Sequence, residues 1–451
     1  MQASTKKSKG NISSVFGQLG GGKPTLAPYF LDIKKQLVPG EEQKKKIQAS
    51  YERLIQAFEK EKKEIHERGS NVIPEVHIND IKKNNGKLPD AIAQLVKKRG
   101  GLVVRGILER DQALKYKDDI KNYIQAHRDD ITGFPEDKPQ VWELYWSASQ
   151  VAARANENFN TATLALGQLW HADPSTPIDF TKNLTYCDRL RIREAGDSSF
   201  TLGEHIDSGS VERWEDETYR KCYQKIFDGE WEEYDAFDAT HRAEAKMILH
   251  ESPGGCNMFR SFQGWIGLSD IVKDGGHIKL CPLLKEQTAY YMMKPLLEEY
   301  INEPDLLGAY PGRCHDISKE YHSPIVDLMV SAPDIRCGDA VFWHCDQVHS
   351  VEYMNTMSTD STVLYIPATP LCKINSDYLK VQRDAFENGL TPPDFPDNHS
   401  EQNFNDRIKV EHLNELEKIG MGFQRFPIFD HESLTPGQLQ AIKQHNEILG
   451  I

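Results

Sequence analysis

The sequence lacks the long apolar runs that a membrane protein needs. None of its 451 residues belongs to a stretch approaching the roughly 18 consecutive apolar residues of a membrane span. Positive charge is also scarce, since 54 Lys and Arg stand against 68 Asp and Glu, a formal net charge of -14. These absences exclude an integral membrane protein and argue against a nucleic-acid-binding surface. We expect a small-molecule or protein partner, with no nucleic acid and no membrane.

Paired cysteines and a secretory signal are missing as well. The eight cysteines are scattered without a CxxC pair, which argues against a zinc ribbon and a small disulfide scaffold. The first ten residues, MQASTKKSKG, contain no apolar signal core. Reduced thiols in a cytoplasmic protein are therefore expected, although the acid-free leader before Asp32 has a weak likeness to a transit peptide.

The N-terminal part divides into a tail and a helix. Residues 1–30 are rich in Gly, Ser and Lys, which predicts a poorly ordered tail. Residues 17–23 read GxxxxGK, but Pro24 stands where a phosphate-binding loop needs Ser or Thr, so we reject that interpretation. In the segment 31–75, apolar residues recur at helical spacing among many Lys and Glu residues. This pattern predicts an amphipathic surface helix.

The main body is predicted over residues 76–430. Short strand-like segments, separated by Gly, Pro, Asn and Asp, favour a mainly β core with α layers. We predict a double-stranded β-helix, which is a cupin-like jelly roll, with helical N- and C-terminal extensions. Two insertions, at about 211–250 and 285–322, interrupt the strands and are predicted to be lids over a substrate pocket. Residues 431–451 are predicted to form a C-terminal helix.

His-x-Asp occurs four times, at residues 127–129, 171–173, 205–207 and 344–346, where chance alone predicts about one copy. A metal site with open positions needs two ligands from one strand end and a third from a distant strand. The first copy lies in a polar helix and the second closes a helix, where capping is the better interpretation. The third ends a strand-like run and precedes Ser-Gly-Ser, so it is the strongest candidate.

The third ligand is not decided by spacing alone. His344 and His349 are five residues apart, and this odd offset would place them on opposite faces of a regular strand. Both therefore cannot be ligands unless the strand bulges.

At this point the sequence resembles a known family. Residues 338–349, GDAVFWHCDQVH, resemble the GD-x4-H-x4-H segment of the phytanoyl-CoA-hydroxylase-like iron/2-oxoglutarate oxygenases. Together with FRSFQGWIGLSDI at 259–271 and VLYIPATPLC at 363–372, this segment is most similar to the bacterial and fungal domain-of-unknown-function 1479 group, over roughly residues 75–430.

The resemblance implies a non-haem Fe(II)- and 2-oxoglutarate-dependent dioxygenase. His349 would be the distal metal ligand, and His205 and Asp207 would complete the catalytic Fe(II) site. The co-substrates would be 2-oxoglutarate and O₂, and the oxidised substrate would be an unidentified small molecule.

One departure from the family concerns the far carboxylate of 2-oxoglutarate. The family pairs this carboxylate with an Arg shortly beyond the distal His, but here Asp360 and Ser361 occupy that place. A buried dicarboxylate still needs a cation. Arg260 is the first candidate, because it lies on a strand-like segment among apolar neighbours. The other candidates are Arg191, Arg193, Thr362 and Tyr365.

Two other functions stay open. Zinc or manganese in the same ligand set would suit a cupin-type hydrolase or isomerase, because ligand type alone does not choose the metal. A non-enzymatic jelly-roll binding module, which recruits a partner through the charged N-terminal helix, is the second alternative. Iron stoichiometry and oxygen-dependent succinate formation would separate the three.

Overall fold

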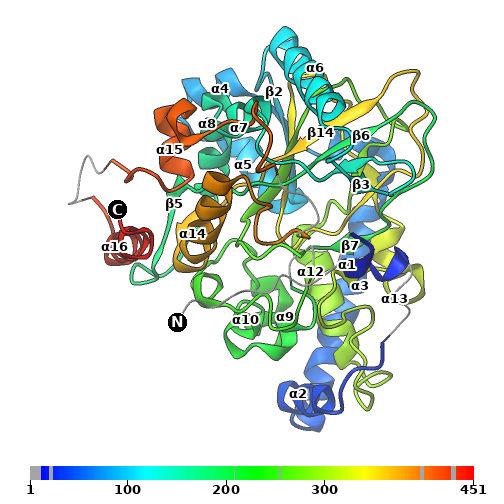
Figure 1. The fold of residues 1–451 in the computed structure, drawn as a ribbon. Coiled ribbons are helices and arrows are strands. Elements are labelled where there is room, and N and C mark those ends of the chain that lie inside the picture. Colours follow the sequence, from blue (N-terminus) through cyan, green and yellow to red (C-terminus); the bar gives the residue numbers. More distant parts are fainter. Residues whose placement is uncertain (1–11, 20–23, 208, 253–254, 397–400, 428–432) are drawn as a thin grey trace.

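Two large, mainly antiparallel sheets and one small sheet organise this mixed α/β protein (Figure 1). The computed structural model describes residues 12–19, 24–207, 209–252, 255–396, 401–427 and 433–451. The predicted sheets and helical layers are both present in this part of the chain. No helix among the described residues is long and apolar enough to cross a membrane.

The large sheet has eight strands, and all of its pairs are antiparallel except the first. In spatial order these strands are β1 (Glu75–His77), β2 (Gly101–Arg105), β12 (Ala340–His344), β8 (Phe262–Gly267), β14 (Ser361–Tyr365), β6 (Leu190–Arg193), β4 (Val141–Trp142) and β3 (Gly133–Phe134).

The second sheet has five short strands, and a third sheet has two. In spatial order the second sheet contains β10 (His315–Asp316), β7 (His205–Ile206), β13 (His349–Val351), β9 (Ile278–Leu280) and β11 (Val330–Ser331). The third pairs β15 (Pro370–Cys372) with β5 (Ile178–Asn183).

The central strands of the large sheet are apolar on both faces. Every residue of β12 and of β8 is buried, because helices cover one face and the second sheet lies beyond the other. Strands covered on both faces read as continuous apolar runs rather than as alternating ones. This explains why AVFWH and FQGWIG carry little alternation.

Helices surround the sheets on several sides. The main N-terminal and central helices are α1 (Ile12–Val15), α2 (Tyr29–Leu37), α3 (Glu41–Arg68), α4 (Ile78–Lys83), α5 (Asp90–Arg99), α6 (Arg110–Ala126), α7 (Ala148–Arg154) and α8 (Glu157–Gly167). Those that follow are α9 (Glu212–Glu215), α10 (Glu217–Lys221), α11 (Gln224–Phe227), α12 (Leu284–Met293), α13 (Lys319–Val326), α14 (Lys373–Asn388), α15 (Glu415–Gly420) and α16 (Pro436–Leu449).

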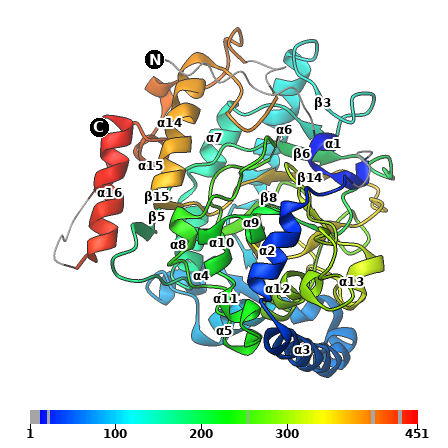
Figure 2. The same cartoon turned by 90° about the horizontal axis from the view of Figure 1, so that it is seen from below.

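Helices from the first part of the sequence and from its last part cover different sides of the molecule. Both views place α2 and α3 away from α14 and α16 (Figures 1 and 2). The segment predicted as an amphipathic helix contains α3, which buries Ile47, Leu54, Phe58 and Ile65 and packs on α12. Such a long helix is stabilised mainly by docking this apolar face.

The predicted tail is only partly described. Residues 1–11 and 20–23 lie outside the described residues, but Ile12–Val15 form the short helix α1. Ile12, Val15 and Phe16 are buried in a small apolar cluster with Phe200. These residues therefore belong to the packed structure, which composition alone did not indicate.

The insertion at 211–250 is built into the core. Its side chains Trp214, Tyr223 and Tyr234 belong to the main apolar cluster, and its Arg213 and Arg242 are buried beside Asp346. Opening this segment as a lid would break buried ion pairs. The lid interpretation stays a prediction, and such a movement would be costly.

Candidate metal centre and cavity

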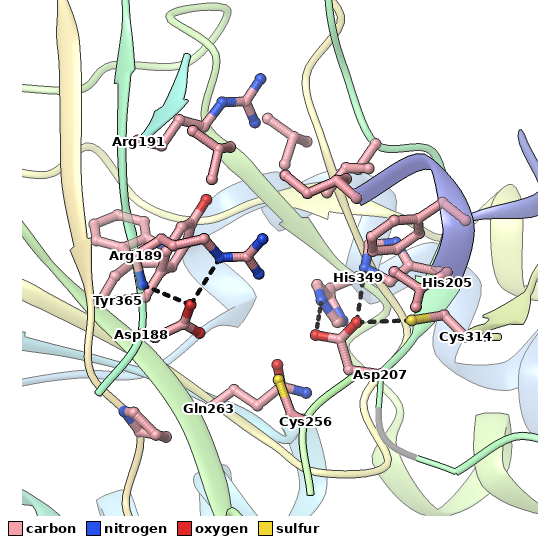
Figure 3. Close-up of a pocket in the computed structure, with 18 of the residues that line it drawn as sticks. Asp188, Arg189, Arg191, His205, Asp207, Cys256, Gln263, Cys314, His349 and Tyr365 are labelled. Carbon is pink, nitrogen blue, oxygen red and sulfur yellow. Dashed lines mark hydrogen bonds and ion pairs between the residues drawn. The ribbon is translucent and has the colours of Figure 1, made fainter. Parts of the chain in front are cut away.

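Three side chains from two paired strands meet at one point (Figure 3). His205 begins β7, His349 begins β13, and the two residues are direct partners in this antiparallel pair. The Nε2 of His205 lies 3.5 Å from Asp207 Oδ1, and the Nε2 of His349 lies 3.6 Å from Asp207 Oδ2. One ligand atom from each lies within 4.8 Å of the others. The structure thus brings the three predicted candidates together.

The turn after β12 decides which histidine joins this group. The chain leaves the large sheet after His344, turns at residues 345–346, and enters the second sheet at His349. The two histidines therefore do not share one strand, as the spacing argument assumed. His344 is fully buried, stacks on Trp170 at 4.8 Å between ring centroids, and its Nε2 lies 3.0 Å from the Ala236 carbonyl.

Backbone carbonyls orient both imidazoles. The Nδ1 of His205 lies 2.7 Å from the Gly203 carbonyl oxygen, and the Nδ1 of His349 lies 3.0 Å from that of Gln347. A carbonyl only accepts, so each Nδ1 carries the proton and each Nε2 keeps a lone pair in the neutral imidazole. Metal-binding histidines are commonly held in this way.

Asp207 is ionised in this environment. Burial alone would raise its pKa, but the hydrogen bonds from His205 and His349 hold the pKa well below its usual range. Two further groups lie near the carboxylate: the Cys314 thiol donates to Oδ1 at 3.3 Å, and Arg260 Nη2 lies 4.0 Å from Oδ2. Two imidazole nitrogens and one carboxylate are a suitable ligand set for a divalent transition metal.

A cavity of about 160 Å³ opens beside this group, between the two large sheets. The wall formed by the large sheet includes Arg191, Arg193, Gln263, Trp265, Ser361 and Tyr365. Helix α1 and Phe16, the residue that follows it, supply an apolar wall, where the ring of Phe16 meets that of His205 edge-on at 4.9 Å between centroids. The cavity therefore has one polar side and one apolar side.

Three arginines face this cavity from one edge of the polar side. Arg189, Arg191 and Arg193 alternate along β6 and the residue before it, so their side chains leave the same face. Arg189 has carboxylate neighbours, because its Nε lies 3.3 Å from Asp188 Oδ1 and its Nη1 lies 3.5 Å from Glu143 Oε1. Arg191 and Arg193 have no such carboxylate neighbour among the described residues.

Arg193 is buried without a carboxylate partner among the described residues. It is 1% exposed, donates to the carbonyls of Glu352 at 2.7 Å and of Tyr353, and its Nε has no hydrogen-bond partner. Burial, followed by the charge of Arg191, lowers the pKa of Arg193 to about 10. It still carries a positive charge at neutral pH, and Ser361 lies directly opposite on β14.

The remaining predicted co-substrate residues lie in different places. Tyr365 lines the cavity, and Arg260 lines it close to Asp207. Thr362 is absent from the lining, because it leaves the other face of β14 and its hydroxyl donates to Asp360. Asp360 itself pairs with Lys117 at 2.9 Å and with Lys121, so it faces away from the cavity.

Sequence reasoning missed several cavity residues. Phe16 and Cys314 come from segments that carry no motif, and Gln263 stands inside an apolar strand. The alternation of Arg189, Arg191 and Arg193 was a usable signal, since three cations on one strand face require partners. The sequence around Cys314 contains no comparable pattern.

Comparison with known proteins agrees with the resemblance at the level of the family. A family model described as Gig2-like matches residues 24–423. The chain belongs to the Gig2-like family. The uncharacterized protein YbiU of Escherichia coli K12 is 33% identical over 367 residues, which cover 79% of this chain and 86% of that protein.

Two crystal structures of similar proteins share the fold. GlcNAc Inducible Gene 2 (DUF1479) from Candida albicans is 29% identical with a TM-score of 0.84, and the alignment covers 95% of this chain and 96% of that one. The hypothetical protein JW0805 from Escherichia coli is 31% identical with a TM-score of 0.79, covering 89% and 99%. The predicted likeness of this Gig2-like chain to the domain-of-unknown-function 1479 group is confirmed.

Proposed function

We propose that this Gig2-like protein is a non-haem Fe(II)- and 2-oxoglutarate-dependent oxygenase that acts with O₂ on a small molecule. The observation that carries the proposal is the meeting of His205, Asp207 and His349 at the wall of a cavity. A two-His-one-carboxylate set with open positions is the ligand set of such oxygenases.

The strand order supports the double-stranded β-helix that this function would use. Strands β6, β7, β8 and β9 alternate between the large sheet and the second sheet, and so do β11, β12, β13 and β14. In the large sheet β6 and β12 flank β14 and β8, and in the second sheet β7 and β11 flank β13 and β9. This alternation is expected when one chain winds between two facing sheets.

The residues present fit Fe(II). The Nδ1 of each imidazole faces a backbone carbonyl and Asp207 is ionised, so the two Nε2 atoms and the carboxylate are the three donors, and a bound metal would replace any proton shared between Nε2 and Asp207. Bound iron would supply the activation of O₂ at the expense of 2-oxoglutarate. The protein would orient both ligands and exclude water, with Phe16 of the apolar wall packed on His205.

Arg193 is the residue that we assign to the far carboxylate of 2-oxoglutarate. In the family the cation comes from the region where Asp360 and Ser361 stand here. Ser361 is the direct cross-strand partner of Arg193, so Arg193 reaches the same part of the cavity from the neighbouring strand. Arg260 lies near Asp207 instead, where it would help to position the metal-binding end of the keto acid.

The test is co-substrate turnover by the full-length protein. Anaerobically purified protein loaded with Fe(II) should form succinate from 2-oxoglutarate only when O₂ is added, and His205→Ala should abolish this reaction. Thr362→Val is the matched control, because Thr362 lies on β14 but faces away from the cavity. If the metal-loaded wild type binds no 2-oxoglutarate, the oxygenase proposal is wrong.

A further inference from the structure

Two buried guanidinium groups that line the cavity have no carboxylate partner among the described residues, and the keto acid would satisfy only one. Besides Arg193, Arg191 is 4% exposed and has no ion pair within the described part of the chain. A buried cation without a counter-ion is costly. In an enzyme, a buried cation of this kind is expected where a bound ligand supplies the negative charge.

The contacts of Arg191 are all with neutral groups. Its Nη2 donates to the Gln140 side-chain oxygen at 2.7 Å and to the Phe200 carbonyl at 2.9 Å, and its guanidinium lies over the Phe200 ring. Asp197 is the acid whose charge acts on Arg191, and it is held by Gln140, Ser199 and Lys138. Gln140 thus separates the two charges, and Asp197 is already neutralised by Lys138.

The position of Arg191 suits a substrate rather than the keto acid. Figure 3 shows Arg191, Arg189 and Tyr365 on one side of the cavity and the group of His205, Asp207 and His349 on the other. Arg191 pairs with Val363 of β14, so Tyr365, two residues farther along that strand, leaves the same face and lines the cavity beside it. An anion held here would leave the rest of the molecule in the space between this wall and the candidate metal centre.

The apolar wall of the cavity indicates what the rest of the ligand is like. Ile12, Val15 and Phe16 line the cavity beside Arg191 and are part of the same apolar cluster as Phe200. Burial lowers the pKa of Arg191, as expected for a cation without a counter-ion. A ligand that fits both walls has an anionic head and an apolar body.

We propose that Arg191, with Tyr365, binds the anionic headgroup of the substrate, so that the substrate is a small amphipathic carboxylate or phosphate ester. This inference rests on the proposed function for the statement that the ligand is a substrate. The anion site itself can be tested without turnover.

The experiment compares probes that share a six-carbon chain and differ in the headgroup. Hexanoate, hexyl phosphate and the neutral hexanamide are titrated calorimetrically into the full-length protein loaded with Zn(II), with and without saturating 2-oxoglutarate. At least one anion should bind about 10-fold or more tightly than hexanamide, the scale of a hydrogen bond to a charged group. A preference between the two anions identifies the headgroup as carboxylate or phosphate.

Variants separate this site from the keto-acid site. Arg191→Gln should remove the preference for the anion while 2-oxoglutarate still binds, and Arg191→Lys should recover part of it because the charge remains. Arg193→Gln should have the opposite effect: it should weaken the binding of 2-oxoglutarate and leave the binding of hexanoate unchanged. Tyr365→Phe should reduce the preference less than Arg191→Gln does.

Two results would overturn the proposal: equal binding of the anions and hexanamide to the wild type, or an anion preference that persists in an Arg191→Gln variant that still binds 2-oxoglutarate. Failure of the proposed function has a different signature. In that case 2-oxoglutarate does not bind the wild type, whereas the comparison of hexanoate with hexanamide without 2-oxoglutarate still reports on Arg191.

Discussion

Two His-x-Asp sequences, at residues 205–207 and 344–346, have contrasting surroundings in the same protein. In each, the side chains lie close enough to share a metal, with Cys345 as the third member of the second group. Asp207 lies at the cavity, and its side chain is 22% exposed. The Asp346 side chain is 0% exposed and is absent from the cavity lining.

The partners of the two carboxylates explain the difference. Asp346 pairs with Arg242 and with Arg213 at 3.5 Å, and it accepts a hydrogen bond from the Tyr223 hydroxyl at 2.9 Å. Burial would raise the pKa of Asp346, but these two arginines hold it below its usual range. Its charge is already neutralised, so it stabilises the fold.

Asp207 has two imidazoles as its main partners, and their Nε2 atoms are potential metal ligands. The same His-x-Asp spacing thus stabilises the fold at residues 344–346 and forms part of a candidate metal centre at residues 205–207. What separates them is whether the surrounding residues already satisfy the charge.

The largest expected effect is on stability. Asp346→Ala would remove the buried carboxylate that pairs with both Arg213 and Arg242, so it should lower the free energy of unfolding by about 3–5 kcal/mol. Urea unfolding with the wild type and Asp207→Ala as references measures this loss. A smaller loss in Asp346→Ala than in Asp207→Ala would contradict the structural role of Asp346.

Metal binding should respond in the opposite way. Asp207→Ala removes a proposed ligand and should weaken Fe(II) or Co(II) binding by more than the roughly 10–100-fold typical of changes beyond the ligands themselves. His344→Ala is the matched control and should leave metal stoichiometry unchanged. Anaerobic titration measures both, and loss of metal from His344→Ala with retention in Asp207→Ala would reverse the assignment.

Low pH should destabilise the fold through His344, which belongs to the His-x-Asp sequence at residues 344–346. Burial, which outweighs the attraction of Asp346, lowers the pKa of His344 to about 3, and Arg242 also disfavours its protonation. In the unfolded chain His344 takes up a proton near pH 6.5, whereas the folded protein does not. Its contribution to stability is therefore complete above that pH and is lost as the pH falls toward 3.

The loss should amount to at most about 1.4 kcal/mol for each pH unit. Urea unfolding at pH 6.5 and pH 5 measures it, and His344→Gln should show a smaller decrease than the wild type. An identical pH dependence in the two proteins would mean that other buried histidines, such as His322, account for it.

The smallest effect should come from the thiol beside Asp207. Cys314→Ala removes the hydrogen bond to Oδ1 and should weaken metal binding by about 10-fold, the lower end of the range for residues that support a ligand. Cys345→Ala, in the structural copy, is the control and should leave metal affinity unchanged. Equal affinities in both variants would show that Cys314 does not position Asp207.

Much of this arrangement was predictable from local sequence. The strand-to-turn exit after Asp207 and the apolar runs of β12 and β8 indicated the third His-x-Asp copy and the core strands, because hydrophobic pattern and turn residues act over a few neighbouring positions. The lysine- and glutamate-rich pattern before residue 69 likewise indicated α3. The family resemblance supplied His349, which spacing alone left open against His344.

Tertiary structure decided the rest. Which arginine would face the proposed keto acid depends on the register of β6 with β14, which places Arg193 opposite Ser361 across 168 residues of chain. The burial of Phe16 against His205 joins parts of the chain that are even farther apart in sequence. Local sequence determined the chemistry available at each strand end, but only the packing of distant strands determined which charges were neutralised and which were left facing the cavity, because charge compensation is a property of neighbours in space.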